Sequence, residues 1–131
     1  MSLGLPNPDC TSRQVQAAVS LLALNNEVDS RGAVFTRREV VDFILDLIGY
    51  TEDQPLHEKR LLEPSFGGGD FLLPIIERLL GAWRAAKPNG SALDDLANAV
   101  SAVELHHETF HNTYTAVFSL LKRQGIATNA A

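Results

Sequence analysis

The sequence predicts an α/β fold built on parallel strands, and two observations support this prediction. A short apolar run reaches an acid at Glu63, breaks at Pro64 and passes a glycine triplet at 67–69 before apolar residues resume at helical spacing. A second short apolar run ends at Glu104 and is again followed by a helical pattern. Strand, helix, strand and helix in this order begin an open parallel sheet with right-handed crossovers. We therefore expect two parallel strands with flanking helices.

Two helical patterns precede the first strand. The first follows a proline-containing start, ends at residues 25–26 and predicts a helix within an N-terminal extension of residues 1–31; it consists of Val15, Ala18, Val19 and Leu22. The second begins at Thr36, which with Glu39 fits a capping box, and ends at Gly49. Its expected apolar face consists of Val40, Ile44 and Leu47.

Three further helices are expected after the glycine triplet. Pro74 is tolerated only in a first turn, so the next helix should begin close to Asp70. Its apolar residues are Phe71, Leu72, Ile75, Ile76, Leu79, Leu80 and Trp83. The polar break that follows allows a short helix from Ser91. The last helix, which follows Glu104, has basic residues in its final turn and stops at Gly125; its apolar residues are Phe110, Tyr114, Val117, Leu120 and Leu121.

Length, composition and charge restrict the class of protein. The 131 residues are 45% hydrophobic, which fits about one domain. They contain no apolar run long enough to span a bilayer and no secretory signal at the start, so we expect a cytoplasmic protein without a membrane partner. A single cysteine excludes a disulfide framework within the chain. A net charge of -5 has the wrong sign for holding nucleic acid phosphates directly.

The two acids and the glycine turn should meet at the carboxyl edge of the sheet, where such folds bind ligands. A carboxylate at the end of the second strand can accept hydrogen bonds from ribose hydroxyls, which predicts a nucleoside site. Asp70 stands where a phosphate-binding loop needs lysine, and Leu72 stands where the dinucleotide fingerprint needs its third glycine. S-adenosylmethionine carries an amino group and no phosphate, so an acidic turn suits it better.

Three stretches resemble a known family in the family's own order. The stretch "LLEPSFGGGDFLLPI" resembles the first motif of S-adenosylmethionine-dependent DNA methyltransferases that act on the amino group of adenine; Glu63, Pro64, Gly67, Gly69, Phe71 and Leu72 match. Upstream, "RGAVFTRREVVDFILDLI" resembles a motif of the gamma-class enzymes of restriction-modification systems through Gly32, Phe35, Thr36, Val40 and Val41. Arg37 departs from the proline that is usual there. Downstream, "AVSAVELHHETF" is similar to the second motif.

The resemblance covers about residues 32 to 126 and implies a Rossmann-like methyltransferase fold, with 32–131 as its incomplete N-terminal part. It implies that Phe35 and Thr36 lie near the methionine end of S-adenosylmethionine. The residues implied around the cofactor's amino acid portion are Glu63, Pro64, Ser65, Phe66, Gly67 and Gly69. Glu104 would hold the ribose hydroxyls and Leu105 would pack on the adenine. For Phe71, Leu72 and Leu105 a role in the core alone is the alternative.

The stretch "HETFH", residues 107–111, also fits the H-E-x-x-H pattern of zinc peptidases. Such a site needs a third protein ligand, usually downstream, and the sequence after His111 contains no His, Glu, Asp or Cys. Upstream candidates exist at 57–58, but their spacing does not favour them. We therefore expect no metal site and interpret the pentapeptide as the start of a helix.

The chain lacks the Asn/Asp/Ser-Pro-Pro-aromatic motif with which this family holds the flipped adenine. We therefore expect no catalytic residue here, and interpret the chain as the amino-terminal piece of a larger enzyme, inactive alone, whose missing part meets DNA. Open sheet edges predict that the piece can associate with itself. Two alternatives stay open: a non-catalytic interaction module with a methyltransferase-like fold, and the cofactor half of an RNA or protein methyltransferase.

Overall fold

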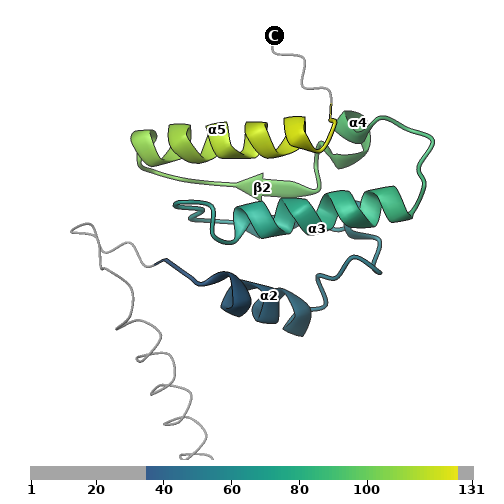
Figure 1. The fold of residues 1–131 in the computed structure, drawn as a ribbon, viewed down its shortest axis with the longest axis horizontal. Coiled ribbons are helices and arrows are strands. Elements are labelled where there is room, and N and C mark those ends of the chain that lie inside the picture. Colours follow the sequence, from purple (N-terminus) through teal and green to yellow (C-terminus); the bar gives the residue numbers. More distant parts are fainter. Residues whose placement is uncertain (1–34, 127–131) are drawn as a thin grey trace, which may run out of the picture. The chain divides into compact units, whose positions relative to one another are not determined.

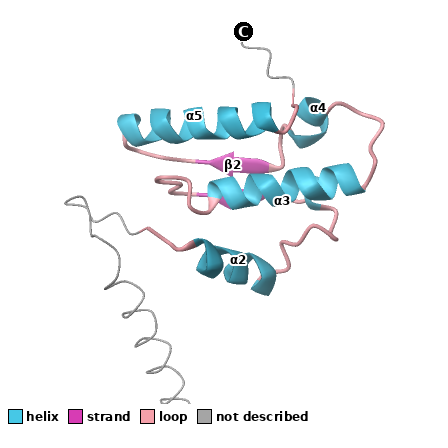
Figure 2. Ribbon diagram, viewed as in Figure 1, coloured by secondary structure: helices cyan, strands magenta, loops and turns pink. Residues whose placement is uncertain are grey.

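The structure is a computed structural model that describes residues 35–126 (Figure 1). Its elements are α2 (Arg38–Leu47), the 3-10 helix η1 (Leu56–Glu58), β1 (Leu61–Glu63), α3 (Leu72–Ala85), α4 (Ala92–Leu96), β2 (Val100–Ala102) and α5 (His107–Arg123). In this view β2 runs between α3 and α5, and α2 lies next to α3 (Figure 2). The helix predicted from residues 15–22 and the N-terminal extension lie outside the described residues.

The two strands pair in parallel, which confirms the predicted α/β class. Leu61 lies opposite Val100, and the register continues to the pair Glu63 and Ala102. The prediction that the second strand reaches Glu104 is wrong, because β2 ends two residues earlier. Backbone hydrogen bonds to the neighbouring segment continue as far as Val103, and the Glu104 carboxylate then accepts the backbone N–H groups of Gly67 and His106.

Helix α2 forms where the sequence predicts it, but its start and its buried face differ from the prediction. The residue at its N-cap is Arg37, and no side chain caps the helix, so the capping box of Thr36 and Glu39 is wrong. The residues that α2 buries are Val41 and Leu45. The expected face of Val40, Ile44 and Leu47 lies beside them: the first two are half-buried and the third is 73% exposed. The predicted stop at Gly49, with φ of +71°, is confirmed.

The core lies where α2, η1 and α3 meet. Its buried residues are Val41, Leu45, Tyr50, Leu56, Ile75, Leu79, Ala82 and Ala99. Leu56 is fully buried although it comes from η1, which no sequence pattern predicted. Phe71 packs against this cluster and Leu72 is buried, so both serve the core.

The remaining boundaries follow the sequence closely. Helix α3 begins at Leu72, with Pro74 in its first turn as predicted. The Ser91 side chain caps α4 by accepting the N–H of Leu93 at 3.3 Å, as serine does at many helix starts. Helix α5 ends before Gly125, whose φ is +72°. Within residues 35–126, no helix is long and apolar enough to cross a membrane.

Candidate cofactor site

The glycine turn between β1 and α3 is the centre of the candidate site. Gly67 and Gly69 have φ of +48° and +92°, a region that side-chain-bearing residues rarely adopt. The N–H of Gly69 donates to the carbonyl of Phe66 at 2.8 Å and closes the turn. A Cβ atom at Gly69 would lie 3.1 Å from a methyl carbon of Thr113. Both glycines are therefore required by the backbone conformation, and Gly69 also by its tight surroundings.

Glu104 joins the end of β2 to this turn. One carboxylate oxygen accepts the N–H of Gly67 at 2.9 Å, and the other accepts the N–H of His106 at 2.9 Å. These bonds favour the charged form and therefore lower the pKa of Glu104 below its ordinary value; the bond from His106 contributes most. The carboxylate is therefore ionised at neutral pH and lies beside the turn, as the sequence predicted for these two features.

Glu63 and its neighbours form the start of the turn. The Glu63 carboxylate accepts the N–H of Ser65 at 3.1 Å, and the N–H of Phe66 donates to the carbonyl of Val103 at 3.0 Å. Pro64 and Ser65 are exposed, whereas Phe66 is 6% exposed. The backbone of the turn is thus accessible at Pro64 and Ser65, and the buried ring of Phe66 anchors it.

Thr36 is also tied to the turn, although it precedes α2. Its N–H donates to a carboxylate oxygen of Asp70 at 2.7 Å, across 34 positions of sequence. The structure therefore brings Thr36 to the same edge of the sheet as Glu104. Phe35 is 48% exposed.

Thr113, which α5 contributes to the site, was not predicted from the sequence. Its hydroxyl donates to the carbonyl of Gly67 at 2.6 Å, and the residue is 3% exposed. Nearby, the rings of Phe66 and Phe110 lie 5.6 Å apart and those of Phe110 and Tyr114 lie 6.2 Å apart. Thr113 follows polar neighbours in the sequence, and no local pattern distinguishes it from a surface residue.

Leu105 is 92% exposed directly after Glu104. A large apolar side chain this exposed is free to contact a planar ligand beside the carboxylate. A role in the described core, the alternative raised for it above, does not fit this exposure.

The H-E-x-x-H stretch lies in the first turns of α5, where the sequence predicted a helix start. The side chains of His106, His107, Glu108 and His111 are all exposed. Among residues 35–126, no three His, Cys, Asp or Glu side chains gather in a way that could hold a metal ion.

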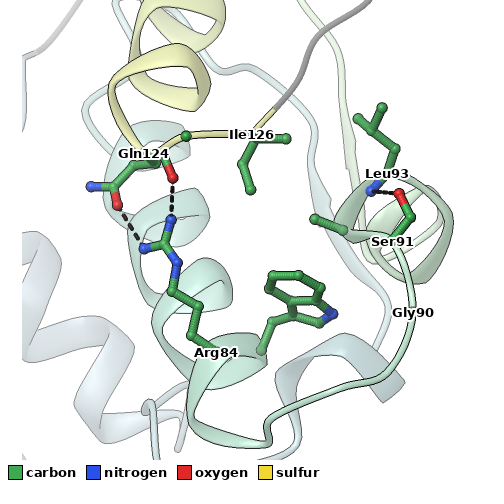
Figure 3. Close-up of a pocket in the computed structure, with 9 residues that line it drawn as sticks. Arg84, Gly90, Ser91, Leu93, Gln124 and Ile126 are labelled. Carbon is green, nitrogen blue, oxygen red and sulfur yellow. Dashed lines mark hydrogen bonds between the residues drawn. The ribbon is translucent and has the colours of Figure 1, made fainter.

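A cavity of about 510 Å³ lies elsewhere, between the end of α3, the start of α4 and the residues after α5 (Figure 3). Arg84 crosses from α3 to bond the side-chain and backbone oxygens of Gln124 at 2.6 and 2.5 Å. Helices in this arrangement run back against the strands, so their ends lie at the amino edge of the sheet. None of the cofactor residues predicted above lines this cavity. Its position is opposite to the edge at which such sheets bind ligands.

Comparison with known proteins shows similarity to type II methyltransferases. The chain is 71% identical over 117 residues, 89% of its length, to the type II methyltransferase M.PaeR7I of Pseudomonas aeruginosa, of which it spans 20%. It is 48% identical over 79% of its length to M.XhoI of Xanthomonas vasicola and 43% identical over 60% to M.BstVI of Geobacillus stearothermophilus, both also type II methyltransferases. It spans 19% and 14% of them.

No family model and no solved structure matches the chain. The chain thus spans about a fifth or less of the curated relatives it matches. The predicted relationship to the methyltransferases of restriction-modification systems is confirmed: over most of its length, this chain matches a segment of type II methyltransferases.

Proposed function

We propose that this chain is the cofactor-binding part of a gamma-class, S-adenosylmethionine-dependent DNA methyltransferase that modifies the amino group of adenine. The observation that carries the proposal is the contact of Glu104, after β2, with the N–H of Gly67, in the turn after β1. This contact puts a carboxylate able to accept ribose hydroxyls beside a backbone turn able to approach a ligand closely. The type II methyltransferases that the chain resembles support the same reaction class.

The residues at this edge fit S-adenosylmethionine better than a nucleotide with phosphates. Three carboxylates, those of Glu63, Asp70 and Glu104, bond backbone N–H groups in or next to the turn. They would repel a phosphate, and they take up N–H groups that would otherwise bind one. When bound, S-adenosylmethionine supplies an electrophilic methyl group on a sulfonium. Glu104 would hold the ribose, Leu105 would cover the adenine, and the segment of Phe35 and Thr36 would lie toward the methionine end.

The chain is proposed to bind cofactor without completing methyl transfer. Its 131 residues contain no Pro-Pro-aromatic motif to hold a flipped adenine, and their net charge is -5. DNA contact and base flipping would then belong to other parts of the longer enzymes that it resembles. The names of these relatives favour an enzyme segment over a non-catalytic module. The DNA substrate, in preference to RNA or protein, rests on the resemblance of the three motifs. A cytoplasmic location stays a prediction.

Calorimetric titration with S-adenosylmethionine and S-adenosylhomocysteine tests the proposal. Glu104→Ala should weaken binding by at least about tenfold, because hydrogen bonds to a charged group are among the stronger ones. Glu104→Gln should weaken it less, since the amide oxygen can still accept one hydrogen bond. The matched control is Glu108→Ala, an exposed glutamate in the first turn of α5.

Binding that Glu104→Ala leaves unchanged would move the site away from β2. No binding by the folded wild-type chain would contradict the proposal for this chain. Zinc analysis of the same sample checks the expectation that the H-E-x-x-H stretch holds no metal, which a stoichiometric zinc content would contradict.

A further inference from the structure

Thr113 is the polar side chain that the described part of the chain buries most completely. It is 3% exposed, and it lies on α5 facing the glycine turn. Its hydroxyl donates to the carbonyl of Gly67 at 2.6 Å, while its methyl carbon lies where a Cβ at Gly69 would reach within 3.1 Å. A threonine on this helix thus contacts the turn through both branches of its side chain. Another threonine of the same helix, Thr115, is exposed and bonds the carbonyl of His111 within α5.

The hydrogen bond fixes the orientation of one peptide group. The residues described contain no cis peptide bond, so the carbonyl of Gly67 and the N–H of Gly68 point in opposite directions. Because the carbonyl points to buried Thr113, the N–H of Gly68 points away from α5. Gly68 is exposed, and none of the hydrogen bonds within residues 35–126 uses its N–H.

The Thr113 bond also restricts the conformation of the turn. Gly67 is held in the left-handed region, and its N–H is fixed by Glu104 while its carbonyl is fixed by Thr113. Without the second bond, the peptide between Gly67 and Gly68 would be free to rotate about the bonds on either side. The carbonyl could then turn outward and put a second acceptor where the N–H donor is now.

We infer that Thr113 is a positioning residue for the cofactor site: its hydroxyl holds the Gly67–Gly68 peptide so that the Gly68 N–H faces a ligand. The ligand is one with a carboxylate, such as the amino acid portion of S-adenosylmethionine, so the inference rests on the proposed function. Thr113 acts through the turn and does not itself touch the ligand.

The test compares Thr113→Val, which keeps the shape and removes the hydroxyl, with Thr113→Ser, which keeps the hydroxyl. Thr113→Ala removes both the hydroxyl and the γ-methyl group, adds no new group, and is used if the valine variant does not fold. Thr115→Val is the matched control on the exposed side of the same helix. Two quantities are measured on the whole chain: affinity for S-adenosylmethionine by calorimetry, and amide hydrogen exchange by NMR.

We expect Thr113→Val to weaken binding by about 3- to 10-fold, the effect of one hydrogen bond. Exchange of the Gly67 and Gly69 amides should become faster while core amides in α3 keep their rates, which a merely structural role would not produce. Thr113→Ser should restore both quantities, and Thr115→Val should leave both unchanged.

The inference is overturned if folded Thr113→Val or Thr113→Ala has the affinity and turn amide exchange of the wild type. It is also overturned if turn and core amides speed up together, since the hydroxyl then serves general stability. If the wild-type chain binds no S-adenosylmethionine, the proposed function fails for this chain. In that case, the exchange rates of the Gly67 and Gly69 amides in Thr113→Val still test whether Thr113 orients the peptide.

Discussion

Tyr50 lies in the core with its hydroxyl group unpaired. The side chain is 5% exposed, and no hydrogen-bond partner for its hydroxyl occurs within residues 35–126. Burial raises the pKa of Tyr50 to about 12, because the charged phenolate is disfavoured away from water. The hydroxyl therefore adds desolvation without the hydrogen bond that would compensate it.

Tyr50→Phe should leave the free energy of unfolding at pH 7 unchanged or raise it by about 1 kcal/mol. Because the folded-state pKa is raised, the tyrosine's contribution is fully present below about pH 10. It is lost as pH rises toward 12, when the unfolded chain ionises first. Urea unfolding at several alkaline pH values should show that the free energy of unfolding falls less with rising pH in the variant than in the wild type.

Tyr114→Phe is the control, because Tyr114 is 58% exposed. Its alkaline profile should follow that of the wild type. A loss of more than about 1 kcal/mol at pH 7 in Tyr50→Phe would mean that the Tyr50 hydroxyl is hydrogen-bonded in solution.

At the scale of residues, the sequence predicts part of the candidate site. Glu104 and the glycine turn could be placed together because parallel strands share a carboxyl edge, and the turn residues carry their own backbone preference. The contact of Thr113 with Gly67 and the hydrogen bond that the Thr36 N–H donates to Asp70 could not be predicted. Both are contacts between residues more than 30 positions apart, and neither residue type has a local pattern that requires the contact.

Arg78 joins α3 to α2. Its guanidinium bonds the Asp46 carboxylate at 2.6 Å, the Asp42 carboxylate at 3.1 Å and the backbone carbonyls of Tyr50 and Asp42 at 3.0 and 3.2 Å. The side chain is 14% exposed, so the bonds to the two carbonyls are sheltered from water. Arg38 on α2 also bonds across this interface, to the Glu77 carboxylate on α3 at 2.8 Å, but its side chain is 53% exposed.

Arg78→Met should lower the free energy of unfolding by about 1 to 3 kcal/mol, because it leaves two backbone carbonyls without their partner. Arg38→Met is the matched control and should lower it by less than about 1 kcal/mol, as expected for an exposed ion pair. Urea unfolding of both variants measures the difference. Equal losses in the two variants would show that the interface does not depend on the buried guanidinium.

The buried face of α2 shows why periodicity alone was not enough at the scale of elements. The helix carries apolar residues on two adjacent faces, one with Val41 and Leu45 and one with Val40, Ile44 and Leu47. Both have helical spacing, so the pattern correctly predicts a helix without selecting the face. The selection comes from α3 and η1, against which the first face packs. Within residues 35–126, the order of the strands and α-helices, which depends on local pattern alone, was predicted correctly.

At the scale of the whole molecule, several large apolar side chains of the described residues lie exposed outside the core. Leu62 on β1 is 63% exposed, and Phe43 and Leu47 on α2 are 65% and 73% exposed. The described sheet has two strands, each with one open edge. Parallel sheets are normally covered on both faces, so this surface is suited to contact with further protein.

We expect the chain to self-associate through the sheet, with a weight-average mass that rises with concentration in sedimentation equilibrium. Leu62→Lys should weaken this association, because a charge on an uncovered strand opposes pairing and burial. The control is Leu47→Lys on α2, where the leucine is 73% exposed, and this variant should leave the association unchanged. A mass that stays monomeric at high concentration would contradict the prediction, and an effect of Leu47→Lys instead would move the contact to α2.

The glycine turn is held at separate points by Val103, Glu104 and Thr113, and the Asp70 that follows it by Thr36. Each contact removes conformational freedom from the backbone when the chain folds. A ligand that binds this turn does not have to order it again, so little of the binding free energy is lost to loop ordering. Folding stability and ligand affinity are therefore coupled through the same few hydrogen bonds. The conformational entropy of the turn is lost when the chain folds, so it is not lost again when a ligand binds.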